Sequence, residues 1–228
     1  MTNLNIKIAH NIQVMRNTKT TVNFHSNVST DFDTSKFDIA TFDDGLYCQI
    51  DTIKELSKKL PVYFFPSGFL TRTKEYCFVE NSLAHNTLEK IFGSKEYLEK
   101  DHYCFNTFMT QDEIESLIQH PNVFFGVHGW FHLNLDKVTV KQWSLIVKDA
   151  TLTAEYYLSL IKKYPNEFII DNTLHLNYAC PYNVLNDTQK LWITIFLKEI
   201  SKHSIYKNIE LIVFSHERIE YENLTYSN

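Results

Sequence analysis

The sequence predicts an α/β fold in which parallel strands alternate with helices, arranged as an open sheet or as a barrel. Along the 228 residues, short apolar runs typical of buried strands alternate with amphipathic segments typical of helices. Apolar residues make up 44% of the chain and charged residues 21%, which provides a core and argues against a disordered chain. Because the chain has only five Gly and five Pro and no repeat, we expect a single domain over residues 1–228.

The first part of the chain is expected to contain three strands and one helix. The strands are expected at residues 21–25, 37–42 and 62–65, where apolar and β-branched side chains gather. The helix is expected at residues 49–60, because apolar side chains recur there at helical spacing and Pro61 ends the pattern.

Residues 71–109 interrupt this alternation. We expect an irregular, aromatic-rich insertion with one helix at residues 81–92, which Gly93 would end. An insertion of this length is often a lid or a recognition element. Additional covering of the core is an equally good interpretation.

The alternation of helices and strands resumes after the insertion. Thr110 and Glu113 form a capping-box pattern, which predicts a helix that stops at Pro121. A strand is expected at residues 123–127, and a long amphipathic helix is expected to start at Thr139. The remaining expected elements are extended segments at 167–170 and 174–180, a helix capped by Asn186 or Asp187, and a strand at 209–214.

Composition and charge exclude several classes of protein. The net charge of −5 argues against a protein that binds duplex nucleic acid, because such proteins concentrate Lys and Arg. No apolar run approaches the ~18 residues of a membrane-spanning helix, and the first residues lack the pattern of a secretion signal. We therefore expect a cytoplasmic protein whose four cysteines, scattered without a C-x-x-C motif, are free thiols.

Four polar or turn clusters directly follow predicted strands. They are Asp43-Asp44-Gly45, the segment from His128 to His132, Pro181-Tyr182-Asn183 and Ser215-His216-Glu217. The carboxyl ends of parallel strands meet at one edge of a sheet or barrel, and α/β proteins build their sites at that edge. We therefore expect these clusters to contribute to one functional site.

Two of the clusters contain side chains that bind divalent metals. His128 and His132 are four residues apart, a spacing that would place both imidazoles on one side of a helical turn. Two histidines with one carboxylate leave coordination positions open, which is typical of a catalytic metal centre. Taken alone, the histidines also fit a structural or surface role, and Asp43 with Asp44 also fits a solvated turn.

The other two clusters offer groups for proton transfer and hydrogen bonding. His216 follows an apolar strand, and a histidine beside a metal centre can donate a proton to a leaving group. An isolated histidine is more often structural. Tyr182 either contributes a backbone N–H to an oxyanion or only packs.

Together these motifs resemble the polysaccharide deacetylase family, the NodB homology domain of carbohydrate esterase family 4. The motifs that carry the resemblance are Thr41-Phe42-Asp43-Asp44-Gly45, His128-x-x-x-His132, Pro181-Tyr182 and a strand that leads to His216. They follow the order of the family and extend from Val22 to Glu217. The resemblance implies a distorted, incomplete (β/α) barrel.

The resemblance also implies a metal-dependent reaction. Asp44, His128 and His132 would hold a divalent metal, most often zinc. Asp43 would be the general base that activates a metal-bound water. The substrate would be an N-acetylated sugar or saccharide conjugate, and the products would be acetate and an amino sugar.

Two further roles follow from the same resemblance. The backbone N–H of Tyr182 would stabilise the tetrahedral oxyanion together with the metal. His216 would protonate the departing amine.

The sequence departs from the family pattern at three places. Gly129 stands where the family usually has Ser or Thr, and Ala179 stands where an Arg is usual. The family's Asp and Trp motif has no counterpart, because Asp187 and Trp192 fit a helix cap and a core residue better. Two alternatives therefore stay open: hydrolysis of a C–N bond in a substrate that is not a sugar, and a non-catalytic domain that binds carbohydrate or a partner protein.

Overall fold

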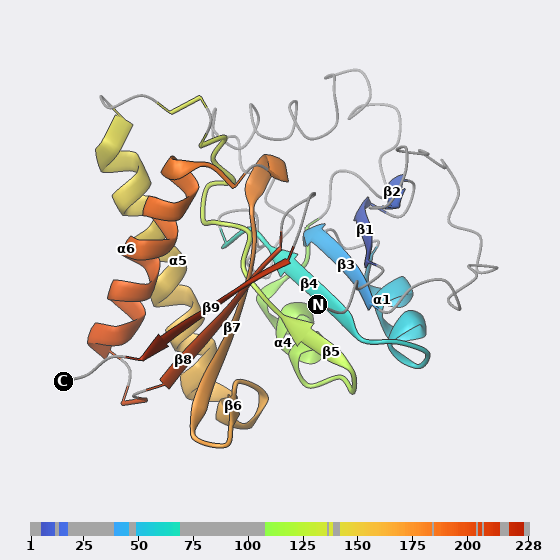
Figure 1. Cartoon of the computed structure of the whole chain (residues 1–228). Coiled ribbons are helices and arrows are strands. Elements are labelled where there is room, and N and C mark those ends of the chain that lie inside the picture. The colour runs from blue at the N-terminus through green and yellow to red at the C-terminus, as the bar shows by residue number, and fades with distance from the viewer. Residues whose placement is uncertain are drawn as a thin grey trace. The chain divides into compact units, whose positions relative to one another are not determined.

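The protein consists of two compact units, Met1–Phe125 and Gly126–Asn228, and each unit contains one sheet (Figure 1). The structure is a computed structural model with a mixed α/β composition. The residues that it describes are 6–11, 14–17, 39–45, 49–68, 108–135, 137–138, 142–183, 185–203, 205–206, 208–214 and 219–225.

The N-terminal unit is built on a five-stranded sheet with the order β2-β1-β3-β4-β5. Its strands are β1 (Ile6–Asn11), β2 (Val14–Asn17), β3 (Ile39–Asp44), β4 (Val62–Pro66) and β5 (Val123–Phe125). Strands β1, β3, β4 and β5 run parallel, and β2 pairs antiparallel with β1 at the edge. The two acidic residues at the end of β3 therefore lie on a central strand.

Helices α1 (Ile50–Ser57) and α4 (Gln111–Ile118) belong to the same unit. The apolar spacing that predicts them is also the face that they bury, since Ile53 of α1 and Ile114 of α4 are fully buried. The Ser57 hydroxyl of α1 lies 3.2 Å from Nδ1 of His120, just beyond α4. The two helices are thus linked through a polar contact as well as through apolar packing.

The C-terminal unit is built on a four-stranded sheet with the order β6-β7-β8-β9. Its strands are β6 (Ile169–Ile170), β7 (Thr173–Ala179), β8 (Asn208–Phe214) and β9 (Ile219–Thr225). The two central strands, β7 and β8, are parallel, and β6 and β9 pair antiparallel at the edges. The carboxyl ends of β7 and β8 therefore lie at the same edge of this sheet.

Helices α5 (Trp143–Lys163) and α6 (Asp187–His203) lie side by side in this unit (Figure 1). The indole of Trp192 on α6 stacks between Tyr178 of β7 and Phe196, with ring centroids 4.4 and 5.2 Å away. The Tyr157 hydroxyl of α5 accepts a hydrogen bond from the backbone N–H of Asn177, at 3.1 Å. Both helices are therefore fixed to β7 by aromatic side chains.

Several predicted elements are confirmed, with shifted ends. The strand predicted at 37–42 is β3, which continues to Asp44, and the helix predicted at 49–60 is α1. The predicted core position of Trp192 is confirmed, because its side chain is 1% exposed. Asn186 is the cap of α6, since its Oδ1 accepts the backbone N–H of Gln189 at 2.8 Å.

Other predicted elements differ from the structure. The extended segment predicted at 167–170 is a 3₁₀ turn, Pro165–Glu167, followed by the two residues of β6. The strand predicted at 123–127 ends at Phe125, and Val127 forms a separate parallel bridge with Tyr178. The strand predicted at 21–25 and nearly all of the predicted insertion lie outside the described residues.

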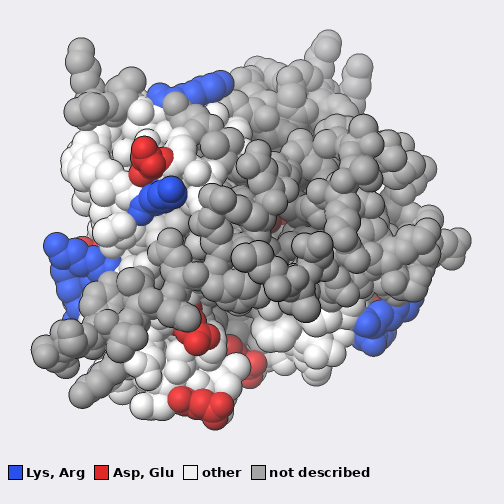
Figure 2. Space-filling model, in the orientation of Figure 1, with Lys and Arg blue, Asp and Glu red and all other residues white. Residues whose placement is uncertain are grey.

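The described strands form two separate sheets, and neither sheet is closed on itself in the described part of the chain. The (β/α) barrel therefore stays a prediction, as does the single domain. Among the described residues, no helix has the length and apolar character needed to cross a membrane. On the face drawn in Figure 2, the Lys and Arg side chains of the described residues stand in separate groups.

Substitution of Thr110 tests the capping box that begins α4. The Thr110 hydroxyl accepts the backbone N–H of Glu113 at 3.3 Å, and the backbone N–H of Thr110 donates to Glu113 Oε2 at 2.7 Å. Thr110→Ala should lower the free energy of unfolding by about 1 kcal/mol, measured by urea denaturation, because it removes the hydroxyl acceptor. Thr110→Ser keeps that acceptor and should remain close to the wild type; equal losses in both variants would contradict the assignment.

Candidate metal centre

Both acidic residues at the end of β3 are buried. Asp43 is 2% exposed and Asp44 is 3% exposed, so the interpretation of these residues as a solvated turn is wrong. The register of the sheet places Asp43 beside Phe65 and Asp44 beside Pro66 of β4. A buried carboxylate needs a compensating cation or hydrogen-bond donors, and this requirement makes the end of β3 a candidate site.

The backbone changes direction at the end of β3. Asp44 and Gly45 have φ values of 71° and 73°, in the left-handed region. A Cβ at position 45 would lie 2.7 Å from Cβ of Pro66, so glycine is required there both by conformation and by space. The Gln49 amide donates to the carbonyl of Asp43, and the N–H of Met109 donates to the carbonyl of Gly45, both at 2.8 Å. The bend that carries Asp44 is therefore held on both sides.

His128 has a defined tautomer. Its Nδ1 lies 2.8 Å from the carbonyl oxygen of Ala179, at the end of β7. A carbonyl only accepts hydrogen bonds, so Nδ1 carries the proton, and Nε2 of the neutral ring has its lone pair available for a metal. Ala179 thus contributes its backbone carbonyl to the orientation of the ring.

His132 lies next to two other rings. Its imidazole is 4.7 Å from that of His128 and 5.0 Å from the phenol ring of Tyr182, measured between centroids. The helical turn expected from the spacing of the two histidines is wrong: the segment is irregular, and Gly129 and His132 have φ values of 76° and 51°. These left-handed residues bend the chain so that the two imidazoles meet without a helix.

The Pro181–Asn183 turn is held from inside the C-terminal unit. Gln189 of α6 is buried, accepts the hydroxyl of Tyr178 at 2.7 Å and donates to the carbonyl of Pro181 at 3.2 Å. Tyr182 has a φ of 60°, and its ring packs edge-on against His132. The ring of Tyr182 therefore packs against His132, and the role of its backbone N–H at an oxyanion stays a prediction.

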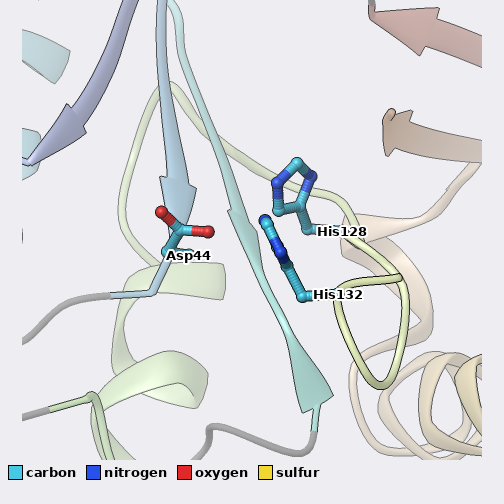
Figure 3. Close-up of side chains that lie close together, drawn as sticks. All are labelled: Asp44, His128 and His132. Atoms are coloured by element: carbon cyan, nitrogen blue, oxygen red, sulfur yellow. The ribbon is translucent and has the colours of Figure 1, made fainter. Parts of the chain in front are cut away.

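Asp44, His128 and His132 form a group with the composition of a metal site (Figure 3). Each offers one ligand atom, these atoms all lie within 4.8 Å of one another, and all three residues are buried. Oδ1 of Asp44 and Nδ1 of His132 make no hydrogen bond, although both residues have other interactions. Two imidazole nitrogens and one carboxylate oxygen are a donor set that suits zinc and related divalent metals, and it leaves coordination positions for water and substrate.

Asp149 on α5 is a buried acid that the sequence patterns do not identify. Its carboxylate accepts the backbone N–H of Phe131 and, at 2.7 Å, the indole N–H of Trp192. Burial raises the pKa of Asp149 to about 6, although these donors and the backbone N–H of Trp130 lower it. One sequence signal could have identified Asp149: it is an acidic residue within a predicted amphipathic helix, one turn before Thr153. In the structure both residues lie on the buried side of that helix.

The structure does not test two of the residue roles that the sequence predicts. His216 lies outside the described residues, so its role as a proton donor stays a prediction. Asp43 is located at the end of β3, and its role as a general base stays a prediction as well.

Similarity to known proteins is found at the level of structure. A scan against protein-family models and a search of curated proteins gave no match. Similar solved structures are IcaB from Ammonifex degensii (15% identity, TM-score 0.44), the Streptococcus pyogenes deacetylase PplD in complex with acetate (16%, 0.41), and a de-N-acetylase from Aggregatibacter actinomycetemcomitans (15%, 0.43). The matches cover 78%, 74% and 80% of this chain and 58%, 55% and 64% of those chains, so this chain spans less than two thirds of their length. Deacetylases are thus among the solved structures that this chain resembles.

The stability of the metal-free protein should depend on the titration of Asp149. A carboxyl with a raised pKa binds its proton more tightly in the folded chain, so it stabilises the fold at low pH and loses this contribution as the pH rises. With a pKa of about 6, the wild type should lose up to about 3 kcal/mol of unfolding free energy, relative to Asp149→Asn, between about pH 4 and pH 7. Urea denaturation at a series of pH values measures the difference, and parallel pH curves for the two proteins would contradict it.

Proposed function

We propose that this protein is a metal-dependent hydrolase that removes an acetyl group from an N-acetylated sugar or saccharide conjugate. The observation that carries the proposal is the buried group formed by Asp44, His128 and His132, whose ligand atoms lie within 4.8 Å of one another. A second carboxylate, Asp43, directly precedes the first in β3. The same residues carry the sequence resemblance to polysaccharide deacetylases, so the motif and the geometry support one site.

Asp44, His128 and His132 would hold the divalent metal, and the preference of this donor set favours zinc. Such a metal supplies a Lewis acid for the acetamide carbonyl and lowers the pKa of a bound water. The hydrogen bond of His128 Nδ1 to the Ala179 carbonyl directs the other ring nitrogen outward as a ligand. The ligand set therefore includes a ring whose orientation is fixed in advance.

Asp43 would take the proton of the attacking water. Adjacent side chains of a regular strand point to opposite faces, which would separate the two carboxylates. The left-handed φ of Asp44, 71°, departs from the regular strand and allows both carboxylates to serve the same site. The conformation of the strand end thus supports separate roles for the two acids: Asp44 would bind the metal, and Asp43 would transfer a proton.

The remaining steps balance the reaction. The water oxygen bonds to the acetamide carbon, and the backbone N–H of Tyr182 would stabilise the oxyanion of the tetrahedral intermediate. The C–N bond then breaks, and His216 would give a proton to the departing nitrogen. The products are acetate and an amino sugar. The incomplete barrel and the cytoplasmic location belong to this proposal as predictions from the sequence.

Zinc content tests the ligand assignment. Asp44→Ala should lower bound zinc from about one ion per chain to almost none, because it removes one of three protein ligands. Asp51→Ala is the matched control, since Asp51 is an exposed acid on α1 whose loss should leave zinc unchanged. Elemental analysis after dialysis gives the zinc content, and circular dichroism verifies the fold. Full zinc occupancy in folded Asp44→Ala would overturn the assignment.

Acetate release tests the reaction. The zinc-loaded protein should release acetate from small N-acetylated sugar conjugates, and Asp43→Asn should keep the metal but lose about 10²-fold or more in turnover. Equal turnover in Asp43→Asn and the wild type would remove Asp43 from the mechanism. A wild type that binds zinc but is inert toward all N-acetyl sugars would favour a C–N bond in another substrate. A wild type that binds no metal would favour a non-catalytic domain.

A further inference from the structure

We propose that Asp149 is a positioning residue, whose carboxylate holds the segment between the two histidines and thereby sets the direction of the His132 imidazole. The effect that we expect on metal affinity rests on the proposed function. Its structural basis lies entirely within the C-terminal unit. Asp149 belongs to α5 and is 1% exposed.

The first observation is how the two carboxylate oxygens are used. Oδ2 accepts the backbone N–H of Phe131, the residue directly before His132. Oδ1 accepts the indole N–H of Trp192 at 2.7 Å. The carboxylate therefore links helix α6 to the histidine segment, and the stacking of Trp192 between two aromatic rings fixes the donor that orients it.

The second observation is the close approach of Gly129 to the same carboxylate. A Cβ at this position would lie 3.2 Å from Oδ1 of Asp149, and the φ of Gly129 is 76°. The segment thus passes so close to the carboxylate that a side chain at position 129 would contact it, and the segment is hydrogen-bonded to the carboxylate at Phe131. Any side chain at position 129 would compete with the carboxylate for this space. Asp149 therefore supports the segment from a separate helix, α5.

The chemistry explains why a carboxylate is needed. The nearby His132 favours the ionised form of this side chain electrostatically, and three N–H donors face it: the backbone of Phe131, the backbone of Trp130 and the indole of Trp192. An ionised carboxylate is a pure acceptor and satisfies all of them, whereas the amide of Asn would direct its own NH₂ toward a donor. Groups that orient a metal ligand from behind typically change metal affinity 10–100-fold when they are lost.

The experiment compares Asp149→Asn with Thr153→Val. Thr153 is a buried residue one turn along α5, and its hydroxyl donates to the backbone carbonyl of Asp149 at 2.7 Å. Its loss removes a hydrogen bond of the same helix without touching the histidine segment. The first readout is hydrogen exchange of the Phe131 amide in the metal-free protein. The second is zinc affinity, measured by competition with a chromophoric chelator.

Asp149→Asn should accelerate exchange of the Phe131 amide at least about tenfold and weaken zinc binding about 10–100-fold, whereas Thr153→Val should match the wild type in both. Should Asp149→Asn fail to fold, Trp192→Phe keeps most of the aromatic stack, removes the orienting donor and should shift both readouts in the same direction. Unchanged exchange and zinc affinity in whichever of these variants folds would overturn the inference. A wild type without zinc affinity would overturn the proposed function, while the exchange of Phe131 would still decide whether Asp149 holds the segment.

Discussion

Burial of a carboxylate or an imidazole costs free energy unless hydrogen bonds or an opposite charge compensate, and this constraint organises the protein. Among the described residues, the buried carboxylates and imidazoles are those of Asp43, Asp44, His128, His132 and Asp149. Each lies at a strand end, in the histidine segment or against that segment. The fold supplies compensation through groups that are fixed by packing: a carbonyl at the end of β7 for His128, and three N–H donors for Asp149. The proposed cation would complete this compensation for the first four.

Backbone conformation shows where the chain bends to place these buried side chains. Six described residues other than glycine have a positive φ, and half of them, Asp44, His132 and Tyr182, belong to the candidate site. Asp, Asn and His enter this region more readily than other residues with a side chain, whereas the bulky Tyr does so rarely. Unfavourable conformations persist when the surrounding structure enforces them, and they concentrate at functional sites. The bends at His132 and Tyr182 support the same conclusion as the buried charges.

Local sequence patterns predict the parts of the structure that depend on interactions between residues close in sequence. The capping box of α4 and the apolar run of β3 are visible because their determinants lie within a few residues of each other. Strands β1, β2 and β9 were not predicted; β2 and β9 are edge strands, whose sequence pattern is typically weaker than that of a central strand. The choice of Asp44, His128 and His132 as metal-ligand candidates follows from the resemblance of the motifs to the polysaccharide deacetylase family. The irregular path between His128 and His132 does not, because contacts with Asp149, many residues away, determine it.

The two histidines differ in how they are oriented, and this difference has an evolutionary consequence. His128 is held by a main-chain oxygen, which every amino acid at position 179 would provide, so substitutions there preserve the contact as long as the strand persists. The segment that carries His132 depends on a particular side chain on a distant helix, and a single codon change can remove that support. Substitutions at position 179 that the core accommodates should therefore leave the contact to His128 intact, whereas sequence drift in this lineage should be constrained jointly at Asp149 and Trp192.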